Sequence, residues 1–236
     1  MGKNSFQFKQ FTINQERCAM KVGTDGTLLG AWAKAPEGPC KILDIGTGTG
    51  LVALMMAQRF PESKVLGVDI DADATIQAQQ NIDVSPFSDR IEILECDATK
   101  MINKDGFDAI VCNPPYFIDS LTCPQNQRTL ARHAVCLSYK SLMETAKSLL
   151  KNDGLFSIVI PTENTEAIES AATFAGLFIS RICMIKTTPT KLPKRQLMEF
   201  RKYQNDHFDF NEEILELFPN QRSLWYQELT KDFYIK

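Results

Sequence analysis

Four consecutive residues, Asn113, Pro114, Pro115 and Tyr116, have the side chains and the rigidity needed to hold an amino group. They follow an apolar run, residues 107–112, that predicts a buried strand, and the prolines must end it because proline donates no backbone hydrogen bond. In the resulting turn, the side-chain oxygen of Asn113 and the carbonyl of Pro114 can both accept hydrogen bonds, while the Tyr116 ring can stack on a flat group. We therefore predict that these four residues are catalytic and act on an NH2 group. A plain loop that only closes a strand is the alternative.

A glycine-rich turn predicts a second site, for a nucleoside cofactor. It contains Gly46, Gly48 and Gly50, and it joins a predicted strand at residues 41–45 to an apolar helix. Glycine lets the backbone pass close to a ligand, and the first turn of a helix presents free N–H groups. The G-x-G-x-G spacing differs from the G-x-G-x-x-G of dinucleotide sites, and Asp44 would repel a pyrophosphate but attract an ammonium group. S-adenosylmethionine carries an ammonium group and no phosphate, so it is the predicted cofactor.

Two further acidic residues follow predicted strands. Asp69 ends the strand that begins at Lys64, about 20 residues beyond the glycines, where a carboxylate can bind ribose hydroxyls. Asp97 follows the strand at residues 91–95 and could meet an adenine amine. An Asp after a strand is commonly a helix cap, as Asp71 is expected to be. The order of these acidic residues, each after a successive strand, favours a binding site over caps alone, because open α/β sheets bind ligands at the carboxyl ends of their strands.

On these motifs, the chain resembles the class I S-adenosylmethionine-dependent methyltransferases, and among them the amino-methylases with an Asn/Asp-Pro-Pro-Tyr turn. Residues 11–18, 21–32, 113–117 and 131–133 resemble more closely the bacterial tRNA adenine-N6 methyltransferases that modify adenosine 37 of a valine tRNA. This resemblance implies N6-methylation of adenosine 37 in the anticodon loop. One departure is Ala72, where many relatives have proline, and it concerns entry into a helix more than chemistry.

The resemblance also implies the residues of each site. The cofactor-binding residues are expected at the ends of four strands: Asp44, Gly46, Thr47, Gly48, Gly50, Asp69, Ile70, Asp97, Ala98 and Asn113. The substrate-binding residues are expected in the proline turn and in two basic stretches beyond it: Tyr116, Phe117, Arg128, Arg132, His133, Lys191, Lys194 and Arg195. For about half of the basic residues, a solvated surface is the competing interpretation. No metal is expected, because the methyl group leaves a positively charged sulfur.

The expected mechanism is polarisation of the amine. Asn113 and Pro114 would accept its two protons, which leaves the nitrogen lone pair directed at the methyl group. Tyr116, with Phe117, would stack the base once it has left the RNA stack. Asparagine cannot act as a general base at neutral pH, and His133 is expected to contact a phosphate or to be structural.

The pattern of elements predicts one three-layer, Rossmann-like α/β domain with helices on both faces. Its sheet should be seven-stranded and mostly parallel, with one antiparallel strand at residues 196–201. Residues 229–236 are a candidate for a further strand. The domain, residues 1–236, is divided into a hairpin and helix preface (1–40), a cofactor-binding and catalytic core (41–203) and a C-terminal extension (204–236).

Composition agrees with an intracellular protein. Seven cysteines without a C-x-x-C pair favour reduced thiols over disulfides or zinc ligands. The first residues lack the apolar stretch of a signal peptide, and the longest apolar runs are too short to span a bilayer. We expect a cytoplasmic protein, more readily a monomer than an oligomer. A net charge of −3 does not exclude RNA, because binding depends on local basic patches.

Four alternatives stay open at the level of sequence. A release-factor glutamine methyltransferase would grip an amide in the same way, but only about forty residues precede the glycine turn, too few for its substrate domain. A ribosomal guanine-N2 methyltransferase also acts on an NH2 group. An NAD-linked oxidoreductase is disfavoured by the glycine spacing, and a catalytically inactive nucleic-acid-binding module by the presence of Asn113 and Asp69.

Overall fold

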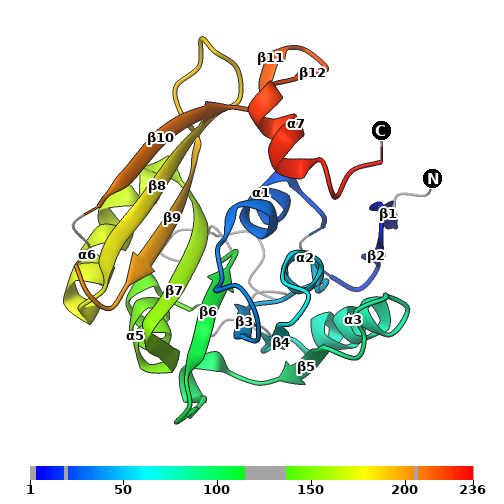
Figure 1. Cartoon of the computed structure of the whole chain (residues 1–236), viewed down its shortest axis with the longest axis vertical. Helices are drawn as coiled ribbons and strands as arrows, with labels where there is room; N and C mark the ends of the chain where they lie inside the picture. Colours follow the sequence, from blue (N-terminus) through cyan, green and yellow to red (C-terminus); the bar gives the residue numbers. More distant parts are fainter. Residues whose placement is uncertain (1–3, 19–20, 115–136, 205–206, 236) are drawn as a thin grey trace, which may run out of the picture.

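The computed structural model describes residues 4–18, 21–114, 137–204 and 207–235. An eight-stranded sheet in the order β10-β8-β9-β7-β6-β3-β4-β5 forms its centre (Figure 1). The strands are β3 (Lys41–Ile45), β4 (Lys64–Asp69), β5 (Ile91–Glu95), β6 (Phe107–Cys112), β7 (Leu150–Pro161), β8 (Phe178–Lys186), β9 (Arg195–Arg201) and β10 (Asp209–Ile214). Strand β9 is antiparallel to both of its neighbours, and all other pairs in this sheet are parallel.

Helices cover both faces of the sheet, so the predicted three-layer α/β fold is confirmed (Figure 1). One face carries α1 (Thr24–Trp32), α2 (Leu51–Arg59) and α3 (Ala72–Asp83), and the other carries α5 (Tyr139–Leu149) and α6 (Thr165–Ala175). The remaining elements are short: β1 (Ser5–Gln7), β2 (Thr12–Asn14), η1 (Ala98–Lys100), η2 (Thr162–Asn164), β11 (Glu216–Phe218), β12 (Gln221–Arg222) and α7 (Leu224–Thr230). Within the described ranges, no helix has the length and apolarity needed to cross a bilayer.

The central strands are buried on both faces, which is why they read as continuous apolar runs in the sequence. In β3, Leu43 and Ile45 belong to the apolar cluster under α5 and α6, whereas Ile42 belongs to the cluster under α1 and α2. Asp44 alternates with Leu43 and therefore points toward α2. Burial of each large apolar side chain contributes about 1.5–3 kcal/mol, so the strands that carry the site are held from both sides.

Two details of the predicted fold are wrong. The sheet has an eighth strand, β10, which pairs in parallel with β8 at the edge. Its sequence contains only Phe210 and Ile214 as apolar residues, so backbone pairing at the edge rather than an apolar pattern defines it. The candidate strand at residues 229–236 is absent from the described residues there, because the helix capped by Ser223 extends to Thr230.

The two ends of the described chain pack together (Figure 1). The Phe8 ring lies 4.7 Å from that of Phe11 and 5.7 Å from that of Tyr234, measured between ring centroids. The Lys9 N–H donates to the Phe233 carbonyl at 2.8 Å, and the Phe233 side chain is buried. The hairpin predicted within residues 1–40 is present as β1–β2, and C-terminal residues complete its core.

Candidate active site

The glycine turn leaves open space where a ligand would approach. Gly46, Gly48 and Gly50 all have positive φ, at 69°, 56° and 80°. A Cβ placed on Gly46 would meet nothing within 4 Å, and one on Gly48 would meet only the Gly46 carbonyl at 4.0 Å. A Cβ on Gly50 would instead touch Ala78 and Ile82 of α3. The first two glycines therefore leave the turn accessible, while the third also allows α3 to pack closely.

Asp44 is buried below the glycine turn and stabilises it through hydrogen bonds. Its Oδ2 accepts hydrogen bonds from the Thr47 hydroxyl at 2.7 Å and from the Ala53 N–H at 3.1 Å. Burial of the side chain raises the pKa of Asp44 to about 7, against the lowering effect of these two donors. Thr47 points into the protein, since a Cβ on Gly67 of β4 would lie 2.8 Å from its hydroxyl oxygen. Thr47 thus shapes the turn through Asp44.

Asp69 joins the end of β4 to the glycine turn. One carboxylate oxygen accepts from the Gly48 N–H at 2.9 Å and the other from the Asp71 N–H at 3.0 Å. Burial raises the pKa of Asp69 above its ordinary value, while these backbone donors oppose the shift. The next residue, Ile70, has 47% of its surface exposed, which places an apolar side chain at the rim of the candidate cofactor site.

Asp97 and Asp71 both act as caps. Asp97 accepts from the Thr99 N–H at 3.0 Å and from the Thr99 hydroxyl at 2.6 Å, and it pairs with Lys100 at 3.1 Å. The Thr99 hydroxyl is the main cause of a lowered pKa at Asp97. The Asp71 side chain accepts from the Asp73 N–H at the start of α3, as expected. Ala98 is buried, and a contact of Asp97 with adenine stays a prediction.

Asn113 lies between the glycine turn and α1. It follows β6, whose last residue, Cys112, pairs with Ile45 at the end of β3. A Cβ on Gly26 of α1 would lie 3.7 Å from the Asn113 side-chain nitrogen and 3.2 Å from Leu51 of α2. The Asn113 amide therefore lies next to the first turn of α1. The remaining predicted residues of this region, Pro115, Tyr116, Phe117, Arg128, Arg132 and His133, lie outside the described residues.

The predicted RNA contacts Lys191 and Lys194 lie in the loop between β8 and β9, residues 187–194, at the same edge of the sheet. Arg195, which directly follows this loop as the first residue of β9, pairs with Pro161 at the carboxyl end of β7. Lys191 and Lys194 are exposed. The Arg195 Nε instead donates to Asp25 of α1 at 2.9 Å, so this predicted phosphate ligand has a partner within the protein.

Two buried amides of α3, which the sequence analysis missed, hold the N-terminal segment beside the site. Asn81 donates to the carbonyls of Asn14 at 2.8 Å and Thr49 at 2.9 Å, and it accepts from the Asn14 N–H at 2.8 Å. Gln77 accepts from the N–H groups of Glu16 and Arg17. The signal in the sequence that could have indicated this role is the pair of amides, Gln77 and Asn81, four residues apart on an otherwise apolar helix face.

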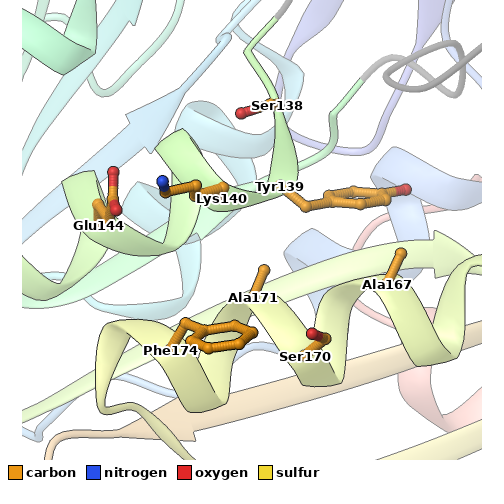
Figure 2. Close-up of a pocket in the computed structure, with 8 residues that line it drawn as sticks. All are labelled: Ser138, Tyr139, Lys140, Glu144, Ala167, Ser170, Ala171 and Phe174. Atoms are coloured by element: carbon orange, nitrogen blue, oxygen red, sulfur yellow. The ribbon is translucent and has the colours of Figure 1, made fainter.

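A separate groove of about 560 Å³ lies between α5 and α6 (Figure 2). Its lining includes Tyr139 and Glu144 of α5 and Ala171 and Phe174 of α6, and it contains no residue of the predicted sites. The turn geometry and the acidic residues place the candidate site at the carboxyl edge of the sheet instead. Among the described residues, no group of His, Cys, Asp and Glu side chains could hold a metal ion.

Comparison with known proteins agrees with this geometry. The family model for the methyltransferase small domain matches residues 26–174. The chain is 46% identical to the tRNA1(Val) (adenine(37)-N6)-methyltransferase of Bacteroides thetaiotaomicron, over 100% of this chain and 99% of that protein. It is 48% identical to the protein of the same name from Phocaeicola vulgatus, over 98% of this chain and 97% of that protein.

Solved structures share the fold. A predicted O-methyltransferase from Agrobacterium tumefaciens matches 89% of this chain and 96% of its own, with a TM-score of 0.69 and 21% identity. A TehB-like S-adenosylmethionine-dependent methyltransferase from Corynebacterium glutamicum matches 77% of this chain and 89% of its own, with a TM-score of 0.53 and 18% identity. The predicted fold class, the enzyme class and the dependence on S-adenosylmethionine are thus confirmed at the level of the family. With more than 40% identity over full-length relatives, the chain belongs to the tRNA1(Val) (adenine(37)-N6)-methyltransferase family of class I methyltransferases.

Proposed function

We propose that the chain transfers the methyl group of S-adenosylmethionine to N6 of adenosine 37 in the anticodon loop of a valine tRNA. The observation that carries this proposal is the position of Asn113, which follows the strand beside the open turn of Gly46 and Gly48. An acceptor at this point can hold an amine against a cofactor bound over the turn. The names of the full-length relatives support the choice of tRNA and of adenosine 37.

The cofactor would lie across the glycine turn, and when bound it supplies a methyl group on a positively charged sulfur. Asp69 is half-buried beside Gly48, where its carboxylate can accept hydrogen bonds from ribose hydroxyls. Asp44 would attract the ammonium group of the methionine part from beneath the turn. Ile70 and Ala98 would contact the adenine ring, and Asp97 would contact its amine. The residues present therefore fit the cofactor.

The target amine would be held by acceptors of this chain. Asn113 Oδ1 and the Pro114 carbonyl would each accept one N6 proton, which favours the pyramidal nitrogen that develops during attack. Tyr116, with Phe117, would stack the extruded base. Arg128, Arg132, His133, Lys191 and Lys194 would contact RNA, and shape would contribute to recognition of the tRNA.

The proposal extends to the domain organisation, oligomeric state and location of the protein. The chain would act as a single domain and a monomer, and it would be cytoplasmic, where its RNA substrate is found. The last strand, β10, extends the central sheet, and α7 packs on α1, which supports a single domain over residues 1–236.

The test uses cofactor labelled on its methyl group with three separate substrates: total tRNA, ribosomal RNA and a release factor. The expected product is N6-methyladenosine in tRNA, lost when the valine tRNA transcript carries guanosine at position 37. Label on ribosomal guanine or on protein glutamine would replace the proposal with one of the alternative methyl acceptors. A transcript of another tRNA with adenosine 37 is the matched control for the valine isoacceptor.

A further inference from the structure

We propose that the ion pair between Asp25 and Arg195 positions Asn113 for methyl transfer by holding the first turn of α1 in place. This inference rests on the proposed function for its kinetic consequences. Its structural part, the contact with Asn113, does not depend on the identity of the substrate.

The pair joins two segments that are far apart in sequence. Arg195 Nε lies 2.9 Å from Asp25 Oδ2, and the two side chains are 34% and 20% exposed. Arg195 is the first residue of β9, whereas Asp25 lies in the first turn of α1. Because the pair is partly shielded from water, it can fix the helix against the sheet more firmly than a fully exposed pair would.

In the described part of the chain, no side chain caps the first turn of α1. Its N-cap residue is Gly23, which has no side chain to accept a hydrogen bond from the helix. The opposite end of α1 is bound by Arg59, whose Nη1 donates to the carbonyls of Gly30 at 2.9 Å and Ala33 at 2.6 Å. One arginine therefore holds each end of the helix, and Arg195 serves the end nearer the site.

The residue after Asp25 connects this turn to the catalytic region. A Cβ added to Gly26 would lie 3.2 Å from Leu51, a tight contact, and 3.7 Å from the Asn113 side-chain nitrogen, an ordinary contact, so this turn borders the Asn113 amide. Movement of the first turn away from the sheet would therefore take the backbone of Gly26 away from the Asn113 amide. Asp25 and Arg195 are therefore positioning residues, since they act on the substrate amine through Asn113.

The same geometry changes the role predicted for Arg195 as a phosphate ligand. Its Nε donates to Asp25, and its Nη1 donates to the Lys194 carbonyl at 2.9 Å. A phosphate brought to this guanidinium would also face the Asp25 carboxylate and would be repelled by it. Loss of Arg195 should therefore reduce turnover more than it reduces RNA binding.

A double-mutant cycle tests the pair. Asp25→Asn and Arg195→Gln should each lower kcat about ten-fold, while KM for tRNA, its salt dependence and calorimetric affinity for S-adenosylmethionine stay within two-fold. The double variant should be no slower than either single variant, and Arg195→Lys should recover part of the activity. The control is Asp105→Asn, which breaks the exposed Lys41–Asp105 pair of 3.1 Å outside the site.

A second readout is independent of the substrate. The side-chain amide resonance of Asn113, assigned through its loss in Asn113→Ala, should shift in Asp25→Asn and Arg195→Gln but not in Asp105→Asn. An unmoved resonance, or additive losses in the cycle, would overturn the proposal. A raised KM for tRNA with a flatter salt slope in Arg195→Gln alone would return Arg195 to phosphate binding. Wild-type protein that leaves tRNA unmethylated would contradict the proposed function, and the resonance would still decide the role of the pair.

Discussion

Asp44 combines a buried position with a carboxylate that the proposed binding of the cofactor's ammonium group requires in its charged form. Burial raises its pKa to about 7, so the carboxyl group binds a proton far more readily than an exposed Asp does. Because the pKa in the folded state exceeds that of the unfolded chain, the free energy of unfolding should fall as pH rises from about 4 to about 7. Cofactor binding should respond in the opposite direction, since an ammonium group favours the charged carboxylate.

We therefore predict that affinity for S-adenosylmethionine rises from pH 6 to pH 7. A group with a pKa of about 7 is mostly protonated at pH 6 and half ionised at pH 7, which gives a gain of roughly five-fold. An α-amino group, with a pKa of about 7.7–8.0, stays mostly charged over this interval. Calorimetry at both pH values measures the change, and Asp44→Asn should remove it. Equal pH dependence in the variant would exclude Asp44 as the titrating group.

Asp69→Ala should weaken binding of S-adenosylmethionine by roughly 1.5–3 kcal/mol, the range for hydrogen bonds to a charged group. The variant also releases the Gly48 N–H, which Asp69 binds at 2.9 Å, so the glycine turn loses a restraint. The matched control is Asp71→Ala, which removes the cap of α3 and should reduce thermal stability with a smaller effect on the cofactor. Wild-type affinity in a folded Asp69→Ala protein would remove Asp69 from the site.

Asn113→Ala should reduce turnover by about 10²-fold, because the lost acceptor acts on the amine chiefly in the transition state. Affinity for the cofactor should change little. Single-turnover rates with saturating tRNA measure the chemical step apart from product release. A variant with a near-normal single-turnover rate would contradict the polarisation mechanism, whereas a large loss of cofactor affinity would indicate a binding role.

At the scale of elements, the sequence predicts best where one local pattern dominates. Strands β3, β4 and β6 are apolar runs with polar ends, and the glycines that follow β3 mark the turn. The helix predicted within residues 1–40 is α1, which begins at Thr24. Its sequence Asp25-Gly26 is typical of a turn, but an acid in the first turn also suits a helix N-terminus. Long-range partners lack such local signals. The Asp25–Arg195 pair could not be inferred from either segment.

Asn81 of α3 connects the N-terminal segment to the glycine turn. The side chain is fully buried and makes three hydrogen bonds to backbone groups of Asn14 and Thr49. Asn81→Ala should lower the free energy of unfolding by about 3 kcal/mol or more, since each buried group left unpaired costs about 1–3 kcal/mol. Asn81→Ala should also weaken binding of the cofactor, because Thr49 belongs to the glycine turn.

Chemical denaturation and calorimetry measure these two effects of Asn81→Ala. The control is Gln79→Ala, at an exposed position of the same helix. If Asn81→Ala is as stable as the Gln79→Ala protein, the amide does not hold the N-terminal segment. If stability falls but cofactor affinity does not, the segment is structural and independent of the glycine turn.

The topology of the whole sheet brings the residues of the two predicted sites to one edge. Parallel strands β3, β4, β5 and β6 end together, so residues that follow them meet although they are spread over the chain. The reversed strand β9 begins at that same edge, which adds the basic loop. The sequence predicts this convergence from the order of the elements. It does not predict β10 or the contact of Phe8 with Tyr234, because these depend on edge pairing and on packing between distant segments.

The charge of the whole molecule leads to the last prediction. The chain has a net charge of −3, so attraction to tRNA must come from local basic groups, and Lys191 and Lys194 are the ones we propose. Binding should weaken as salt rises, and neutralising either lysine to Gln should flatten the log–log slope by roughly 0.7–0.9 without changing the methylated base. Lys104→Gln, in an exposed residue before β6 and so at the opposite edge of the sheet, is the control and should keep the wild-type slope. Fluorescence anisotropy with labelled valine tRNA over a salt series measures all three slopes. Equal slopes in wild type, Lys191→Gln and Lys194→Gln would place the RNA on another surface, whereas a changed methylation site would mean that the loop reads the base itself.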